Sequence, residues 1–128
     1  MNKLAFLVIL LLLVTGLFAG CGSQQQPKEY TDPSQGIEVG VGGQFIIVLE
    51  SNPTTGYKWE ANFDNSLLKL VKSDYKQSDA KAGIVGAGGK EYFTFEALKK
   101  GDTKITMTYK RSWETGSAEQ KVFSVSIK

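Results

Sequence analysis

The chain has 128 residues, of which 41% are hydrophobic and 22% charged, and its formal net charge is +2 at pH 7. Without Lys3, which lies in the N-terminal segment, 14 basic residues stand against 13 acidic ones, a net charge of +1. A chain so close to neutral lacks the basic surface with which proteins bind nucleic acid, and its length suits one compact domain after a leader.

The first twenty residues are typical of a secretion signal. Asn2 and Lys3 give a short polar, positive start, and the apolar run over residues 4–14 has the length of a signal core but is short for a bilayer span. We therefore expect residues 1–20 to be a signal peptide that is removed rather than folded.

Cys21, the only cysteine of the chain, follows Leu17-Phe18-Ala19-Gly20. The segment resembles the lipobox of bacterial lipoproteins, with Phe18 where leucine is usual. The resemblance implies that Cys21 carries acyl chains such as palmitate and anchors an extracytoplasmic protein to a membrane of the cell envelope. The alternative is a plain secretory signal that is cleaved after Ala19. We expect residues 21–35 to be the lipidated cysteine and a flexible tether.

Residues 36–128 are expected to form the folded domain, because apolar and polar residues alternate along most of this stretch. Turn residues recur about every dozen positions. This spacing is typical of an all-β, immunoglobulin-like antiparallel β-sandwich, here of about seven strands. A single helical turn over residues 64–68 is also possible. The expected strands cover residues 37–39, 45–49, 57–60, 68–75, 91–97, 104–110 and 122–127.

Missing residue types exclude most catalytic sites. The chain has no histidine, and its single cysteine is assigned to the anchor. A Ser-His-Asp triad, a Cys-His pair and a histidine-ligated zinc site are therefore excluded. The acidic residues are scattered rather than clustered, so we expect no enzyme activity, no cofactor and no metal.

Three turns stand out from the regular strands. In the first, Asn52-Pro53-Thr54-Thr55-Gly56-Tyr57, proline fixes φ at the start and glycine permits a positive φ at the end, so the two threonines project from a stiff tip. The second, Gly86-Ala87-Gly88-Gly89, leaves backbone groups accessible, and the strand after it argues against a phosphate-binding loop. The third, Arg111-Ser112-Trp113, combines residue types enriched in binding hot spots. We interpret the similar turn at residues 40–43 as structural.

These turns connect the second and third, fourth and fifth, and sixth and seventh expected strands. In an immunoglobulin-like sandwich such connections can gather at one end, where they would form a single rigid surface. The three motifs, in this order, resemble the signature loops of the chagasin family of cysteine peptidase inhibitors, and the likeness extends over most of residues 37–128. Ser112 stands where the family usually has proline, which predicts a looser third loop.

The resemblance implies a monomeric, reversible inhibitor of papain-like cysteine peptidases. Thr54 and Thr55 would lie against the catalytic cysteine and histidine of the enzyme, the backbone of residues 86–89 on the non-primed side of its cleft, and Trp113 on the primed side. Arg111 would support its loop or pair with acidic groups. Two alternatives stay open: a carbohydrate- or cell-wall-binding module that stacks sugars on Trp113, Tyr57 and Tyr92, and a structural envelope lipoprotein.

Overall fold

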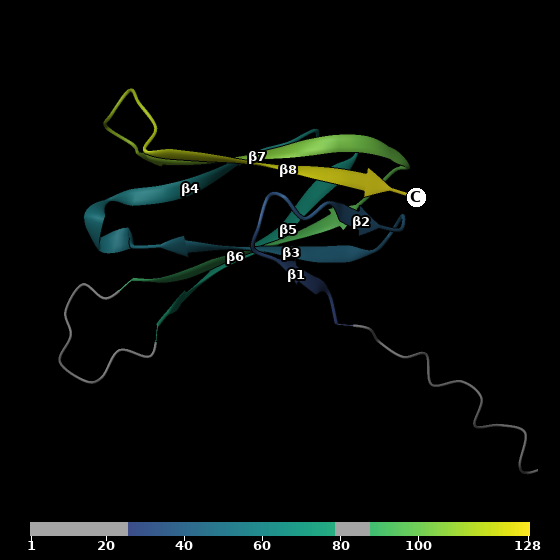
Figure 1. Cartoon of the computed structure of the whole chain (residues 1–128), viewed down its shortest axis with the longest axis horizontal. Helices are drawn as coiled ribbons and strands as arrows, with labels where there is room; N and C mark the ends of the chain where they lie inside the picture. Colours follow the sequence, from purple (N-terminus) through teal and green to yellow (C-terminus); the bar gives the residue numbers. More distant parts are fainter. Residues whose placement is uncertain (1–25, 79–87) are drawn as a thin grey trace, which may run out of the picture.

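The fold is a sandwich of two four-stranded sheets. The computed structural model describes residues 26–78 and 88–128. One sheet has the order β1-β3-β6-β5 and the other the order β2-β8-β7-β4, and the two layers lie face to face (Figure 1). The strands are β1 (Lys28–Tyr30), β2 (Ile37–Val39), β3 (Gln44–Ser51), β4 (Tyr57–Asn62), β5 (Leu68–Gln77), β6 (Gly89–Ala97), β7 (Gly101–Arg111) and β8 (Glu119–Ile127).

The strand pairing is that of an immunoglobulin-like sandwich. Strands β3, β6 and β5 pair antiparallel in one sheet, and β4, β7 and β8 pair antiparallel in the other. The short strands β1 and β2 run parallel to β3 and β8 and complete the two sheets. The predicted fold class is therefore confirmed, and all seven expected strands are present.

Alternation along the strands builds the core. In the middle of β3 and of β6, every second residue is apolar and buried between the sheets: Phe45, Ile47 and Leu49 in β3, and Phe93, Phe95 and Ala97 in β6. Phe45 and Phe95 are fully buried opposite each other, with ring centroids 5.6 Å apart, and Phe63 packs edge-on against Phe95 at 5.2 Å. From β7 and β8 the core receives Ile105, Met107, Phe123, Val125 and Ile127.

One strand, β1, was not predicted from the sequence. Residues 28–30 were expected to belong to the flexible tether over residues 21–35, but they form β1 and pair with residues 45–47 of β3. Tyr30 is buried and meets Phe45 edge-on, with the ring centroids 6.3 Å apart. Burial of a large aromatic ring offsets the cost of ordering three residues, so the ordered part of the domain includes most of the expected tether.

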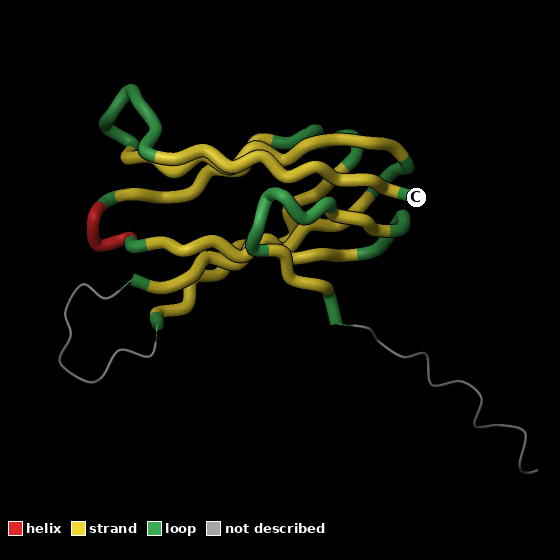
Figure 2. Tube along the Cα trace, in the orientation of Figure 1, coloured by secondary structure: helices red, strands yellow, loops and turns green. Residues whose placement is uncertain are grey.

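The described residues contain one piece of helix, the 3₁₀ turn η1 (Pro53–Thr55). It lies at the same end of the sandwich as the β7–β8 connection and the described ends of β5 and β6 (Figure 2). The suggested turn near residue 64 is a single hydrogen-bonded turn before β5, in which Asp64 accepts from the backbone of Leu67 and Leu68. Over residues 26–78 and 88–128, no helix has the length and apolar character of a membrane span.

Candidate functional site: one end of the sandwich

The connection between β3 and β4, which we call the wedge loop (residues 52–56), is a tight turn with exposed threonines. Gly56 has φ of 84°, in the left-handed region that glycine adopts without steric cost, and its N–H donates to the carbonyl of Pro53 at 3.0 Å. Pro53 occupies the first helical position, where its missing N–H costs nothing. Thr54 and Thr55 are exposed at the tip, as the sequence predicted.

Asn52 holds both threonines in place. Its side-chain oxygen accepts hydrogen bonds from the backbone N–H of Thr54, at 3.3 Å, and from the hydroxyl of Thr54, at 2.5 Å. Its carbonyl accepts from the backbone N–H of Thr55, at 3.1 Å, and from the hydroxyl of Thr55, at 2.6 Å. The asparagine therefore acts as an N-cap whose side chain and backbone together fix the tip.

The tryptophan loop (residues 111–114), which follows β7, braces the wedge loop from one side. The Nε atom of Arg111 donates to the carbonyl of Thr55 at 3.0 Å, and the guanidinium lies 4.3 Å from the ring centroid of Tyr57. Trp113 is 68% exposed, yet its indole covers Gly56 so closely that a side chain at that position would collide with it. Two of the predicted loops are therefore in direct contact.

The turn around Ser112 is closed by a hydrogen bond, although Ser112 stands where the chagasin family usually has proline. The N–H of Glu114 donates to the carbonyl of Arg111 at 3.2 Å, which makes residues 111–114 a hydrogen-bonded β-turn. Glu114 also pairs with the Arg111 guanidinium at 3.1 Å. The ion pair is partly exposed and contributes little by itself, but it holds the same two residues that the backbone bond joins.

The glycine connection reaches the same end through its last residues. Gly86 and Ala87 lie outside the described residues. Gly88 lies next to the carbonyl of Ser51 and to Asn52, with 3.2 Å between that carbonyl and the position a Cβ would take. Gly89, expected in the loop, is the buried first residue of β6, where a Cβ would collide with the Lys76 carbonyl. The described part of the motif, Gly88, therefore stands beside the base of the wedge loop.

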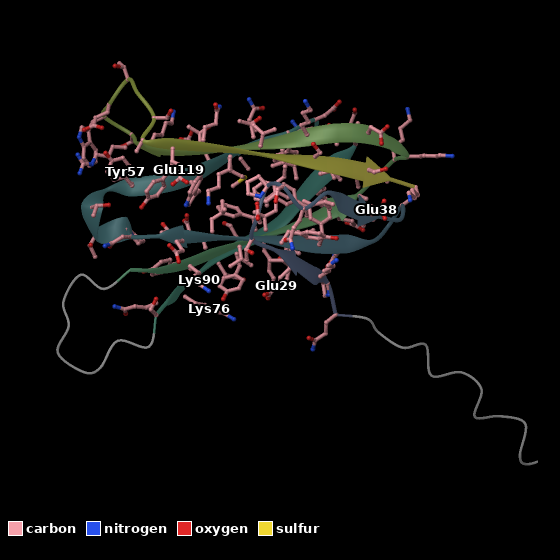
Figure 3. The ribbon with its side chains drawn as sticks, viewed as in Figure 1. Glu29, Glu38, Tyr57, Lys76, Lys90 and Glu119 are labelled. Carbon is pink, nitrogen blue, oxygen red and sulfur yellow. The ribbon has the colours of Figure 1, made fainter. Side chains whose placement is uncertain are left out.

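Aromatic rings extend from the core to this end. The ring of Tyr109 in β7 stacks on Trp59, with 4.8 Å between centroids, and on Tyr57, with 5.0 Å. Tyr57 lies at the loop end of the sandwich, whereas Glu38 lies toward the opposite end (Figure 3). The hydroxyl of Tyr109 accepts a hydrogen bond from the N–H of Asn52 at 3.0 Å. The alternation of apolar and polar residues in this strand gives no sign of this contact with a residue 57 positions away.

A carboxylate also lies between the sheets near this end. Burial raises the pKa of Glu91 above its ordinary value of 4.5, and the N–H of Trp59, which donates to the carboxylate at 3.4 Å, opposes the rise. The Ser51 hydroxyl opposes the rise less than the Trp59 N–H does. Glu91 links β6 to the edge strand β4 of the other sheet.

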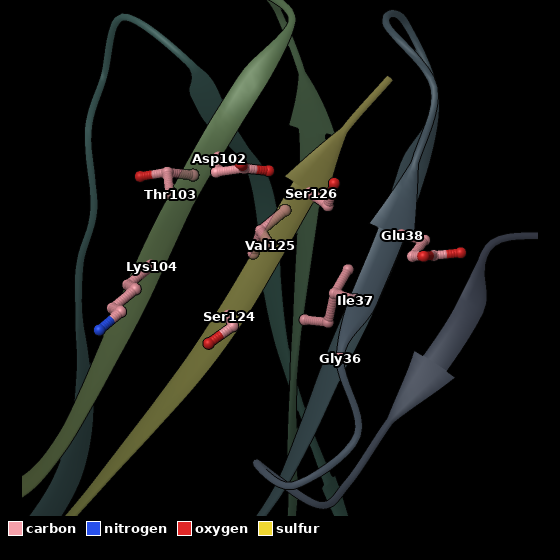
Figure 4. A pocket seen from close by; sticks show the side chains of 9 residues that line it. All are labelled: Gly36, Ile37, Glu38, Asp102, Thr103, Lys104, Ser124, Val125 and Ser126. Atoms are coloured by element: carbon pink, nitrogen blue, oxygen red, sulfur yellow. The ribbon is translucent and has the colours of Figure 1, made fainter.

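A shallow groove of about 440 Å³ lies elsewhere, over β2, β7 and β8 (Figure 4). Ser124, Ser126 and Lys104 are among its lining residues, and it belongs to the half of the sheet that is distant from the wedge loop. In the part of the chain that the structure describes, no group of three or more acidic or cysteine side chains is arranged to hold a metal ion.

The fold and this end together define a class of protein. An immunoglobulin-like sandwich that projects a braced, uncharged loop has the geometry of a protein that binds another macromolecule through its loops. Residues 25–127 match the family described as Chagasin family peptidase inhibitor I42, and the chain belongs to this family of inhibitors, which are not enzymes.

Known proteins similar to this chain agree with that assignment. Chagasin of Trypanosoma cruzi is 33% identical over 97 residues, which are 72% of this chain and 86% of that protein. Amoebiasin-1 of Entamoeba histolytica is 31% identical over 91 residues, which are 71% of this chain and 86% of that protein. The crystal structure of the Entamoeba histolytica cysteine protease inhibitor EhICP2 superposes with a TM-score of 0.67 at 24% identity, over 81% of this chain and 99% of that one.

Proposed function

We propose that this protein is a reversible inhibitor of papain-like cysteine peptidases, and that the wedge loop occupies the active-site cleft of the enzyme. The observation that carries the proposal is the contrast within this loop. Thr54 and Thr55 are exposed and uncharged, while the backbone behind them is held by hydrogen bonds that Asn52 accepts and by one that Arg111 donates. Such a loop enters a narrow cleft with little loss of conformational entropy.

The same bonds explain why an inserted wedge would block the enzyme without being cut. Peptidase clefts of this class bind an extended substrate strand, but residues 53–55 form a 3₁₀ turn. The carbonyl of Thr55 already accepts a hydrogen bond from Arg111. A carbonyl held in this way is not free to enter an oxyanion hole, so the wedge would present no correctly placed scissile bond.

The neighbouring loops would widen the contact. Trp113 is exposed and can stack on an aromatic ring of the enzyme, which contributes about 0.5–1.5 kcal/mol beyond the area buried. Backbone near Gly88 would contact the other side of the cleft. Three connections at one end can cover a standard interface of about 1,600 Å², which is enough for tight non-covalent inhibition by one copy of the chain.

The test is a titration of papain with the full-length protein in detergent, read with a fluorogenic peptide substrate. We expect stoichiometric loss of peptidase activity. Thr54→Arg should raise the inhibition constant by about 100-fold, because a charge would be buried without a partner in the closed cleft. Thr106→Arg, on the outer face of β7 opposite Val122, is the matched control and should leave the constant unchanged. Full papain activity at excess wild-type protein would contradict the proposal.

The rival reading as a carbohydrate-binding module needs a shared aromatic platform. Tyr57 is occupied by the stacked ring of Tyr109 and by the Arg111 guanidinium. Tyr92 belongs to β6 of the other sheet, where Lys76 lies 4.9 Å from its ring centroid. Rings placed and covered in this way do not favour stacking of one glycan chain.

We further propose that acyl chains on Cys21 hold the protein at the outer side of a membrane of the cell envelope. The support is the leader over residues 1–20 and the position of Cys21, the only cysteine, at its end. Labelling with palmitate should be found in the wild-type protein and lost in Cys21→Ala. Equal labelling of the two would contradict a lipid on this residue.

A further inference from the structure

Tyr109 occupies a fixed position beneath the wedge loop. Its ring lies against two other aromatic rings, Trp59 at 4.8 Å with 26° between planes and Tyr57 at 5.0 Å with 28°. Trp59 is buried and is itself held, because its indole N–H donates to the carbonyl of Glu50 at 2.8 Å. A ring stacked in this way has little freedom to turn, so the position of its hydroxyl is set by the core.

That hydroxyl reaches the first residue of the wedge loop. It accepts a hydrogen bond of 3.0 Å from the backbone N–H of Asn52, at a partly buried position. Without this acceptor the Asn52 N–H would have to find another partner or remain unpaired at a partly buried site, which is unfavourable.

Asn52 is the residue through which this contact extends to the tip. Its side chain and carbonyl together accept four hydrogen bonds from Thr54 and Thr55. A shift of Asn52 would therefore move both threonines with it. The hydrogen bond that the Asn52 N–H donates to the Tyr109 hydroxyl ties this unit to β7.

We propose that Tyr109 is a positioning residue for inhibition: its hydroxyl fixes where the wedge loop stands relative to the sandwich, although Tyr109 itself belongs to none of the three loops. The inference rests on the proposed function. Loss of the hydroxyl would leave the fold intact and let the wedge loop sample several placements, of which only a fraction fits the cleft. The apparent affinity falls by that fraction, and the loss is expected in the association rate.

Tyr109→Phe tests this directly, because it removes the hydroxyl and keeps the stacked ring. In the full-length protein we expect the inhibition constant for papain to rise about tenfold, with a lower association rate constant and a melting temperature within a few degrees of wild type. Hydrogen exchange of the Asn52 amide, read by NMR, should become faster. Tyr92→Phe removes a phenol hydroxyl from β6 of the other sheet and should change none of these.

Each outcome decides a separate question. Unchanged inhibition and unchanged Asn52 exchange in Tyr109→Phe would overturn the positioning role while leaving the inhibitor reading intact. The role is also overturned if exchange speeds up and inhibition stays the same, because the bond would then serve the fold alone. If wild-type protein fails to inhibit papain, the proposed function falls, and the role in inhibition falls with it.

Discussion

The two ends of the sandwich secure their turns in different ways. At the end without the wedge loop, the turn over residues 40–43 is held by backbone alone: Val41 donates to the carbonyl of Lys128, Gly42 to that of Ala97, and Gly43 to that of Gly40. At the other end, the wedge loop has two backbone bonds of its own, but the side chains of Arg111, Tyr109 and Trp113 attach it to its surroundings.

The difference separates a turn that serves the fold from one that serves binding. Backbone bonds to neighbouring strands draw a turn into the body of the sandwich, and residues 40–43 gain stability in this way. The wedge loop has to project, so few strands are near enough to supply partners. Side chains reach it instead, and they leave Thr54 and Thr55 exposed. Substitutions should therefore affect inhibition at one end and only stability at the other.

The largest difference in inhibition is expected between substitutions of two glycines that have nearly the same backbone conformation. Gly42 and Gly56 have φ of 82° and 84°, so alanine at either position should cost about 1–2 kcal/mol of unfolding free energy. A Cβ at residue 42 meets open space, whereas one at residue 56 collides with Trp113 and displaces it. Urea denaturation should find similar losses, while papain titration should show inhibition weakened about 30-fold or more in Gly56→Ala alone. Equal inhibition by both variants would refute the contrast.

A smaller effect is expected from two cations at opposite ends. Arg111→Ala removes the bond to the Thr55 carbonyl and the contact with Tyr57, so inhibition of papain should weaken about tenfold. Lys128→Ala removes only an exposed ion pair with Glu38, at 3.4 Å, and should leave inhibition unchanged and stability within about 0.5 kcal/mol. If Arg111→Lys keeps full potency, then charge rather than the planar guanidinium supports the wedge loop.

The smallest effects concern pH, and they have opposite signs at the two ends. The pKa of Glu91 is raised above 4.5 chiefly by burial, so its ionisation disfavours the folded state, and stability is lost as pH rises through the folded pKa. The pKa of Asp64, at the other end, is held below 3.8 by hydrogen bonds from Ser66, so its contribution is lost as pH falls through the folded pKa.

Thermal melts from about pH 3 to 7 check both signs. Relative to wild type, Glu91→Gln should gain stability as pH rises, because the amide carries no charge to bury. Asp64→Asn should be less stable at neutral pH and approach wild type in acid. Parallel curves for all three proteins would show that neither carboxyl contributes.

Patterns within one segment were predictable from sequence, and contacts between segments were not. Two-residue alternation and the spacing of turns predicted every strand except β1, and Pro53 with Gly56 predicted a stiff turn with projecting threonines, because these signals are local. The hydrogen bonds that Asn52 donates to Tyr109 and Arg111 donates to Thr55 depend on which residues the sheets bring together across more than fifty positions. Strand β1 was missed because three residues, two of them charged, carry no period that distinguishes them from a linker.

The direction of β1 determines at which end of the sandwich the N-terminal segment is attached. It runs parallel to β3, so the chain enters the sandwich at the end opposite the wedge loop (Figure 1). Seven peptide units from Cys21 to Lys28 span at most about 25 Å when extended. If lipid on that cysteine anchored the protein, the end of the sandwich where β1 begins would lie close to the bilayer. The end with the wedge loop would then point away from the membrane, where it is accessible to a peptidase.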